Sequence, residues 1–426
     1  MEDPPKSWRL RRGNPCVHAQ TVSRVLRARV AEEPAERSDD AARHPGREAW
    51  WIRRCRARPR CGCLDYRRAD LRCAQPTQKA RSPVWPSAEL HVHIEGTLEV
   101  PLLLRLAERN AVELVSSDPE VLQRRYAFDS LQSFLDLYYE NLAVLRTEQD
   151  FYELCSAYLE RAARAGVRHA EIFFDPQSHT ERGVPLGTVV FGLSRAIGEA
   201  QERWGMTASL ILCLLRHLGG EAASDMIRAA LPFRRHFVGV GLDSSELGFP
   251  PSLFQEAFAI AAAEGLHRVA HAGEEGGPDY VWEALDLLGV ERVDHGNRAL
   301  EDAELMAVLR ERRIPLTVCP LSNLALKTAP DELADHALPV MLDEGLLASV
   351  HSDDPAYFGG YLDDNIAALR AAGVLTEEQF GVLAANSIVS SFASAERKAE
   401  LLAEVRAHAL ALGVAVPAAA RRGAAE

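Results

Sequence analysis

No run of about 18 consecutive apolar residues occurs in the sequence, although 47% of its residues are hydrophobic. A helix needs roughly that length to cross a bilayer, so we expect no membrane span. The start of a secretory signal peptide is also missing, because Arg11 and Arg12 are not followed by an apolar stretch. The 426 residues are enough for one large domain or two ordinary ones with a sizeable core.

The eight cysteines show no spacing typical of a disulfide framework. Five of them lie within the first 85 residues: Cys16, Cys55, Cys61, Cys63 and Cys73. The other three are scattered through apolar surroundings: Cys155, Cys213 and Cys319. Disulfides form in oxidising compartments, so this cysteine usage predicts a cytoplasmic protein.

The first 85 residues differ from the others in charge and in pattern. They contain 20 Lys/Arg and 10 Asp/Glu, whereas the remainder contains 28 basic and 51 acidic residues. The acidic body argues against a broad nucleic-acid surface there. Segment 1–85 has no helical or strand periodicity, which favours a disordered extension or a misassigned translation start. A basic nucleic-acid arm, or a small zinc site at Cys61, Cys63 and Cys73, stays open as an alternative.

From residue 86 onward, short β-rich apolar runs alternate with longer amphipathic helical stretches such as 151–166 and 279–289. The apolar runs are eight in number: 88–96, 168–176, 208–218, 238–246, 267–275, 291–297, 315–323 and 347–355. Near-continuous apolar strands are typical of a parallel sheet that is covered on both faces. Eight strand–helix units predict a (β/α)8 barrel over 86–415, followed by a flexible tail over 416–426. An open doubly wound sheet is the alternative.

Polar and ionisable residues occupy the carboxyl ends of the apolar runs. They are His91 and His93, Glu171 and Asp175, Arg216 and His217, Asp243 and Glu246, His271 and Glu274, Asp294 and His295, Ser322 and Asn323, and Asp353 and Asp354. In a (β/α)8 barrel these ends converge on one face, where such enzymes keep their active sites. A structural protein would have little reason to bury ionisable groups there, because buried charge is costly. We therefore expect an enzyme.

A metal site is the first chemistry that these strand ends suggest. His91 and His93 are two residues apart, so on a strand their imidazoles share one face. His271 after the fifth run and Asp353 after the eighth complete a set of three imidazoles and one carboxylate. Such a set suits Zn²⁺ with a position left for water, although it would also accept Fe²⁺ or Mn²⁺. Asp354 would leave the strand and reach toward a substrate.

The motifs ELHVHIEGTLE, HAGEEG, DHGN, CPLSN and SDDPAYFGGY, in this order, resemble those of the adenosine/adenine deaminase family of metal-dependent barrel hydrolases. The resemblance covers about residues 86–410 and implies one zinc ion held by the four residues named above. It also implies Glu274 as proton donor to the purine ring, His295 as the residue that orients and deprotonates the attacking water, and Asp354 as a partner of a ring nitrogen. Attack on C6 of adenine requires a proton on N1, and a buried carboxyl group can hold one at pH 7.

Several motifs are similar to those of the adenine-deaminase branch of this family. Glu95 stands where adenosine-directed relatives commonly carry an aspartate that contacts ribose, and its longer side chain is expected to fill the ribose space. Ser244 and Ser245 stand where adenosine-type members tend to have a glycine near the purine, and their hydroxyls are expected to contact the substrate. The motifs RHL, FFDPQSHTERG and PAYFGGY agree with this branch. His351 stands in place of a smaller polar residue and is expected to pack, with a further nitrogen ligand near the metal as the alternative.

We therefore expect zinc-dependent hydrolytic deamination of adenine to hypoxanthine and ammonia, as in purine salvage. An adenosine deaminase, or a deaminase of an N6-modified adenine, is the nearest alternative, and a metal-binding pseudoenzyme that acts as a scaffold is the alternative from another class. No P-C-x-x-C follows His93-Ile94-Glu95, which argues against a cytidine-type deaminase. No strand end offers a lysine to bridge two metals, which argues against amidohydrolases of guanine or cyclic amides. We expect a small purine as partner, neither nucleic acid nor membrane, and leave a homo-oligomer open.

Overall fold

Eight parallel strands form a barrel in the computed structural model, which describes residues 84–330 and 332–421. Each strand is hydrogen-bonded to the next one along the chain, in the order β1 to β8. The strands are β1 (Ser87–Glu89), β2 (Val167–Phe174), β3 (Thr207–Leu215), β4 (Gly239–Asp243), β5 (His267–Ala272), β6 (Arg292–His295), β7 (Pro315–Val318) and β8 (Leu347–Val350). Every strand begins within one residue of the apolar run that predicted it or inside that run.

The barrel closes between β1 and β8 through backbone groups just beyond both strands. Val92 and Asp353 form a parallel bridge. The N–H of His93 donates to the carbonyl oxygen of Asp353 at 3.0 Å, and the N–H of Asp353 donates to the carbonyl oxygen of His91 at 3.0 Å. The (β/α)8 prediction is therefore confirmed and the open doubly wound sheet is wrong. Closure itself brings three candidate metal ligands together.

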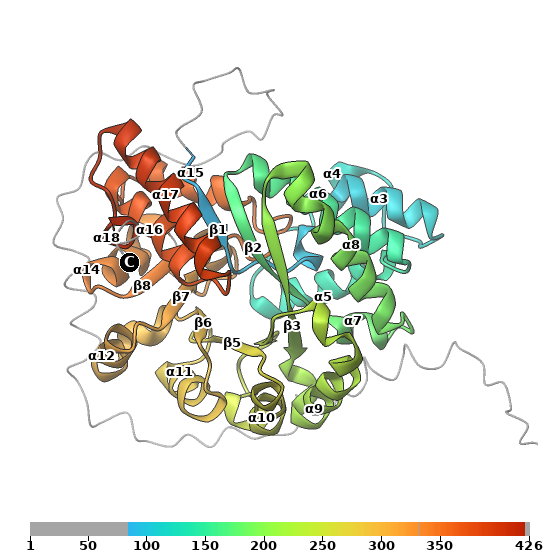
Figure 1. Cartoon of the computed structure of the whole chain (residues 1–426). Helices are drawn as coiled ribbons and strands as arrows, with labels where there is room; N and C mark the ends of the chain where they lie inside the picture. The colour runs from blue at the N-terminus through green and yellow to red at the C-terminus, as the bar shows by residue number, and fades with distance from the viewer. Residues whose placement is uncertain (1–83, 331, 422–426) are drawn as a thin grey trace, which may run out of the picture. The chain divides into compact units, whose positions relative to one another are not determined.

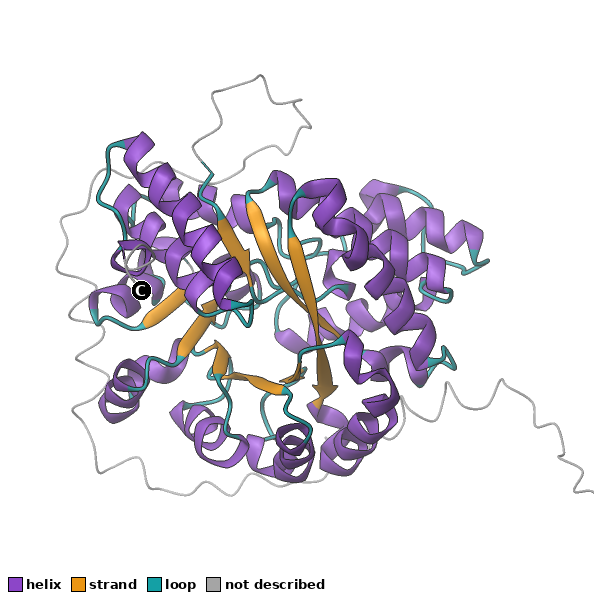
Figure 2. Cartoon of the chain, viewed as in Figure 1, coloured by secondary structure: helices purple, strands orange, loops and turns teal. Residues whose placement is uncertain are grey.

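Helices surround the strands on the outside of the barrel (Figures 1 and 2). They are α3 (Val100–Arg109), α4 (Pro119–Gln123), α5 (Leu131–Asn141), α6 (Glu148–Arg164), α7 (Pro176–Thr180), α8 (Leu186–Trp204), α9 (Gly219–Ala230), α10 (Gln255–Ala263), α11 (Pro278–Glu283), α12 (Ala303–Glu311), α13 (Pro320–Ala325), α14 (Leu338–Asp343), α15 (Leu362–Ala372), α16 (Glu377–Val389), α17 (Ala395–Leu412) and α18 (Ala418–Arg421). A π-helical turn, η7 (Ala284–Leu288), continues α11. The predicted helical stretches 151–166 and 279–289 correspond to α6 and to α11 with η7.

Local sequence signals explain where these helices begin and end, as α6 illustrates. The Thr147 hydroxyl accepts the N–H of Asp150, and the Asp150 carboxylate accepts the N–H of Thr147, which is a capping box. Arg164 lies in the last turn, where a positive charge is favourable. Phe151 and Leu154 belong to the buried face of the helix.

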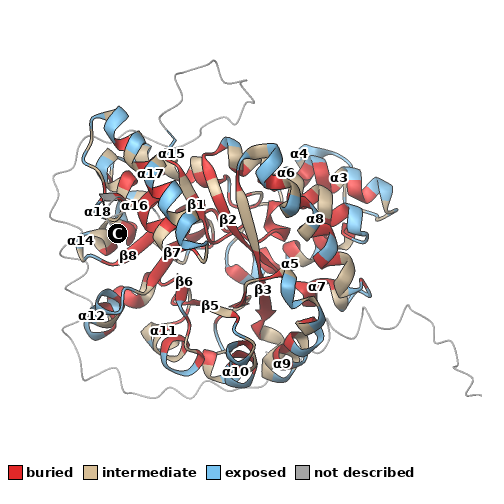
Figure 3. Cartoon of the chain, in the orientation of Figure 1, coloured by how far each residue is buried: buried red, intermediate tan, exposed pale blue. Residues whose placement is uncertain are grey.

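The strands are buried almost throughout (Figure 3). Every residue of β4, β6, β7 and β8 is buried, as expected for strands covered on both faces. Within the described residues, none of the helices is long and apolar enough to cross a membrane. The predicted extension over 1–85, with its alternative zinc site, lies outside the described residues except for 84 and 85. The predicted tail over 416–426 includes α18, and 422–426 lie outside the described residues.

Candidate active site

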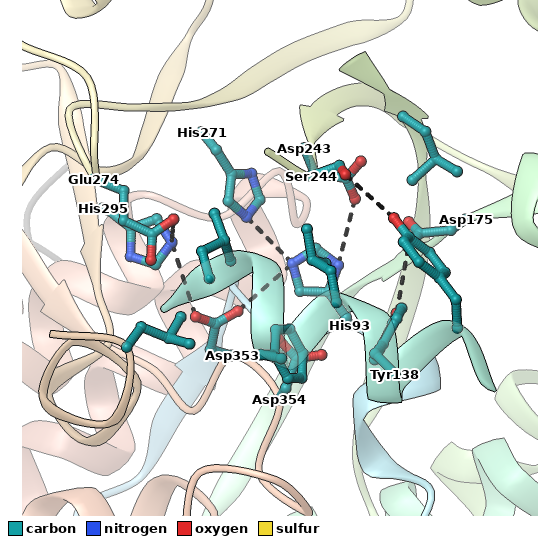
Figure 4. Close-up of a pocket in the computed structure, with 16 residues that line it drawn as sticks. His93, Tyr138, Asp175, Asp243, Ser244, His271, Glu274, His295, Asp353 and Asp354 are labelled. Carbon is teal, nitrogen blue, oxygen red and sulfur yellow. Dashed lines mark hydrogen bonds and ion pairs between the residues drawn. The ribbon is translucent and has the colours of Figure 1, made fainter. Parts of the chain in front are cut away.

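The four candidate metal ligands meet at the carboxyl ends of the strands. The Nε2 atoms of His93 and His271 lie 3.2 Å apart. Asp353 Oδ1 lies 3.3 Å from His91 Nε2 and 3.6 Å from His93 Nε2. One potential ligand atom from each of the four buried residues lies within 4.8 Å of the others. Residues from the first, fifth and eighth strand ends therefore point at one spot (Figure 4).

The second ring nitrogen of each histidine lies near an oxygen atom, within hydrogen-bond distance for His91 and His271 and as a longer ion-pair contact for His93. His91 Nδ1 lies 2.9 Å from Thr317 Oγ1, His93 Nδ1 lies 3.5 Å from Asp243 Oδ2, and His271 Nδ1 lies 3.0 Å from the carbonyl oxygen of Leu242. The contacts of His91 and His271 place the hydrogen on Nδ1 and fix the ring, which leaves the Nε2 lone pair free for a metal.

These residues fit a divalent transition metal. The buried Nε2 of His91 has no hydrogen-bond partner in the described part of the chain, and a buried acceptor without a donor is costly. Burial and the neighbouring His91 and His93 hold the pKa of His271 well below its ordinary value. The His271 ring is thus neutral, as a metal ligand must be. Three imidazole nitrogens and one carboxylate oxygen suit Zn²⁺, Fe²⁺ or Mn²⁺.

Asp353 and Asp354 are neighbours in the chain but differ in ionisation. Burial opposes the charge of Asp353, but the neighbouring histidines His91, His295 and His93 together outweigh it and hold the pKa of Asp353 well below its usual range. Burial and the charge of Asp353 raise the pKa of Asp354 well above its usual range. The Ser322 hydroxyl also donates to Asp353 Oδ2 at 2.6 Å. These surroundings therefore favour the ionised form of Asp353 and the protonated form of Asp354, which lines the cavity and in that form can donate a hydrogen bond.

The backbone around the cluster adopts uncommon conformations. Asp353, His295 and Ser244 have φ values of 63°, 64° and 74°, which non-glycine residues rarely adopt. Such strained positions concentrate at functional sites. Gly96 is required for a different reason, because a Cβ there would lie 1.9 Å from Asp354 Oδ1. The glycine of HIEGTLE therefore makes room for Asp354.

Glu274 follows β5 in a loop that Glu246 holds in place. The Glu246 carboxylate accepts the backbone N–H groups of four successive residues, 273–276, at 2.7–3.0 Å. Glu274 Oε1 faces the cavity without a hydrogen-bond partner among the described residues. Burial and the charge of Asp353 raise the pKa of Glu274 well above its usual range. The surroundings therefore favour the protonated form of this carboxyl group.

His295 lies between Glu274 and the four candidate metal ligands. Its Nε2 atom is 3.5 Å from Glu274 Oε2 and 3.8 Å from Asp353 Oδ2. Its Nδ1 atom lies 3.3 Å from the amide nitrogen of Asn323. Burial and the neighbouring His91 lower the pKa of His295 to about 3, so the ring is neutral at pH 7. A neutral imidazole in this position can orient a water molecule beside the cluster.

One cavity is lined by most of the polar residues described above. Its volume is about 410 Å³ when the open solvent at its entrance is included, and the polar lining includes His93, His271, Glu274, His295, Asp353 and Asp354. One wall is a face of α5, formed by Leu131, Phe134, Leu135, Tyr138 and Tyr139. Glu274 and His295 stand at one side of the cavity, and Asp175, Tyr138 and Ser244 stand at the other (Figure 4). The cavity thus has a reacting end and an opposite end.

The two serines of GLDSSE lie in different surroundings. Ser244 lines the cavity, and its hydroxyl lies 3.2 Å from the Tyr139 hydroxyl and 2.7 Å from His217 Nδ1. Ser245 is not among the lining residues and donates to Gln132 Oε1 at 3.2 Å. Of the two predicted substrate contacts, only Ser244 has a position that could provide one.

Glu95 is not among the lining residues either, although it was predicted to contact the substrate. It lies in a short 3₁₀ turn, η2 (Glu95–Thr97), and is fully buried. Its Oε1 atom accepts the N–H of Asp175 at 3.1 Å and lies 2.8 Å from His179 Nε2. The side chain therefore supports the segment after β2 and does not fill the ribose space directly.

Both ring nitrogens of His351 already have partners. Nδ1 accepts the N–H of Leu90 at 3.0 Å, and Nε2 lies 2.8 Å from Ser349 Oγ. His351 is fully buried. It packs within the barrel, as the sequence led us to expect.

Sequence reasoning assigned no role to Asp175 and Asp243, which both line the cavity. One carboxylate oxygen from each lies within 4.8 Å of the other and of a His93 ring nitrogen. Burial and the charge of Asp175 raise the pKa of Asp243 well above its usual range. Their position at strand ends indicated that both lie near the active-site face of the barrel. That position alone could not distinguish side chains that face the cavity from side chains that only support it.

Residues 86–408 match the model of the adenosine deaminase family. A protein of Streptomyces coelicolor described as adenine deaminase is 57% identical over 325 residues, which cover 76% of this chain and 95% of that protein.

Solved structures agree with this match. The crystal structure of adenine deaminase from Arthrobacter aurescens has 53% sequence identity and a TM-score of 0.74, covering 75% of this chain and 98% of its own. An amidohydrolase from Burkholderia ambifaria, solved with bound Zn, has 26% sequence identity and a TM-score of 0.71. The match covers 78% of this chain and 93% of that protein.

Proposed function

The chain belongs to the adenosine deaminase family, and on this premise we propose that it deaminates adenine hydrolytically to hypoxanthine and ammonia, with one Zn²⁺ per chain. The observation that carries the proposal is the cluster of three imidazoles and Asp353, whose ligand atoms lie within 4.8 Å of one another, with the buried carboxyl group of Glu274 in the adjoining cavity. Attack at C6 with protonation of N1 requires this division of roles. Two similar proteins that are described as adenine deaminases support adenine as the substrate.

His91, His93, His271 and Asp353 would hold the zinc ion. When bound, the ion supplies Lewis acidity that allows a water molecule to lose a proton near neutral pH. The choice of zinc is supported by the bound Zn of the Burkholderia ambifaria amidohydrolase.

The other polar residues of the cavity divide the remaining tasks. His295 orients the attacking water and accepts its proton, because its Nε2 atom is directed at the cluster. Glu274 gives its proton to N1 of the purine, so that the ring does not carry a negative charge when C6 is attacked. Asp354 donates a hydrogen bond to the lone pair of another ring nitrogen. The apolar residues of α5 limit the access of bulk water.

We further propose that the reaction serves purine salvage in the cytoplasm. Within the described residues, Cys155, Cys213 and Cys319 are buried free thiols, which supports a reducing compartment. Hypoxanthine is the 6-oxopurine that salvage reactions can reuse.

The proposal is tested with the full-length zinc-loaded protein by following the loss of the 6-aminopurine absorbance of adenine and of adenosine in parallel assays. Adenine should be turned over and adenosine should react far more slowly. Treatment with a chelator should abolish turnover, and added Zn²⁺ should restore it. Faster turnover of adenosine would contradict the substrate, and inactivity of zinc-loaded protein toward both would contradict the reaction.

A further inference from the structure

Asp175 presents an unused acceptor at the end of the cavity that lies opposite Glu274 (Figure 4). Its side chain is only 3% exposed, and it lines the cavity. Oδ2 accepts a hydrogen bond from the Tyr138 hydroxyl at 3.3 Å. Oδ1 is buried and accepts no N–H or hydroxyl group of the described residues, while the Asp243 carboxyl group lies close enough to Asp175 to share a proton with it. A buried acceptor in a ligand cavity is satisfied at least cost by a donor on the ligand.

The side chain of Asp175 faces the cavity and does not cap the helix that follows it. Asp175 is the residue before α7, the position at which an aspartate usually caps the helix by accepting a backbone N–H. Its side chain makes no such capping bond. The N–H of Asp175 is instead held by Glu95 Oε1, which His179 also contacts. The side chain is thereby free to face the cavity.

We propose that Asp175 selects the free base by accepting a hydrogen bond from the N–H of the imidazole ring of adenine. This inference rests on the proposed function, because it assumes that C6 and N1 lie at the reacting end. The five-membered ring then points toward the opposite end, where Asp175, Tyr138 and Ser244 lie.

The chemistry of adenine explains why this contact discriminates. Free adenine carries one hydrogen on its imidazole ring, whereas the corresponding nitrogen of a nucleoside is bonded to ribose. Asp354 would donate to the nitrogen that has a lone pair, and Asp175 would accept from the nitrogen that has the hydrogen. A nucleoside would leave Asp175 Oδ1 unpaired and would place a sugar against it. Sites built to bind an N–H reject analogues that lack it.

A second reading of the same residues is a cation site. One ligand atom each from His93, Asp175 and Asp243 lies within 4.8 Å of the others. A cation there would neutralise the crowded carboxylates and would leave no acceptor for a substrate N–H. The number of metal ions per chain separates the two readings.

The test compares adenine with 9-methyladenine, which lacks the N9 hydrogen and is used as substrate or as competitive inhibitor. Asp175→Ala should lower kcat/KM for adenine by about 10–100-fold, mainly through KM, because one hydrogen bond to a charged or strongly polar group is lost. The constants for 9-methyladenine should not change. Tyr138→Phe should act in the same direction with a smaller loss. Asp136→Asn, on the exposed face of α5, is the matched control and should behave like the wild type.

Zinc content and melting temperature of every variant accompany these assays. An equal loss for both purines in Asp175→Ala and Tyr138→Phe would overturn the inference, because the residues would then only support the fold. A second metal ion per chain that disappears in Asp175→Asn would also overturn it. If the wild type does not deaminate adenine, the proposed function fails and this inference fails with it. If adenine is deaminated and only the discrimination is unchanged, the inference alone fails.

Discussion

Two sets of buried carboxylates lie inside the same barrel and differ in how they are partnered. In the interior, Glu171 on β2 has a partner on each oxygen. Arg292 Nη1 donates to Oε2 at 2.6 Å, the N–H of Phe392 donates to Oε1, and His169 Nε2 lies 3.4 Å from Oε1. Burial opposes the charge, but the neighbouring Arg292 and His169 together outweigh it, and the pKa of Glu171 falls to about 2.

At the carboxyl ends of the strands, the carboxyl groups of Glu274, Asp354 and Asp243 are equally buried but incompletely partnered. Each has at least one oxygen without a hydrogen-bond partner in the described part of the chain. Burial and neighbouring carboxylates raise the pKa of all three. Burial alone therefore does not reveal the role of a carboxylate. The interior pair is a completed structural contact, whereas the active-site groups keep protons and acceptors for a substrate.

The largest effect is expected from replacing Glu274, the carboxyl group beside the candidate metal ligands. Glu274→Gln should lower kcat for adenine by about 10²–10⁴-fold, because an amide cannot deliver a proton to N1. The melting temperature should stay near that of the wild type, since the altered oxygen has no partner to lose. Glu275→Gln, the half-buried neighbour outside the cavity, is the matched control. Retained kcat in Glu274→Gln would mean that this carboxyl is structural, like Glu171.

The opposite change breaks the interior pair and leaves the active site intact. Arg292→Met should lower the free energy of unfolding by about 3–5 kcal/mol, because Glu171 would remain buried without its cation. Urea unfolding at pH 7 measures this loss, and kcat of the folded protein should be retained. The double variant Glu171→Leu/Arg292→Met should recover most of the stability. A double variant as unstable as Arg292→Met would show that the charge of Glu171 is not the cause.

A smaller effect should follow from crowding Asp354. Gly96→Ala places a Cβ 1.9 Å from Asp354 Oδ1 and 2.7 Å from the Asp354 Cα, so the carboxyl and the backbone beside it should both shift away from their present positions. We expect KM for adenine to rise about tenfold, which corresponds to one lost hydrogen bond. Gly198→Ala, on the exposed face of α8 with nothing near the added Cβ, is the matched control and should not alter KM. An unchanged KM in Gly96→Ala would remove Asp354 from substrate binding.

The barrel could be predicted because its signals are local. Each strand is a short apolar run, and the polar residues at the strand ends follow from chain order once the sheet is parallel. The spacing of His91 and His93 on one strand also has a local meaning, and both rings do point at the same spot. The predicted roles of these residues stay predictions until the variants are measured.

The orientation of Glu95 and the position of Asp175 could not be predicted in the same way. Both are acidic residues near a strand end, and nothing in their neighbours along the chain states which one faces the cavity. The direction of each side chain depends on a helix residue that it contacts. Glu95 contacts His179 on α7, and Asp175 contacts Tyr138 on α5. The family resemblance pointed to Glu95 because it compares residues by their place in a motif.

The amino-acid sequence by itself determined the order of the strands, the set of polar residues at their ends and the family to which the chain belongs. Only the tertiary structure decided that the pKa of Asp353 is lowered while that of Asp354 is raised, and that Asp175 rather than Glu95 borders the cavity. The physical reason is that periodicity and chain order are properties of neighbouring residues. A pKa and the direction of a side chain depend on burial and on charges brought from distant parts of the chain.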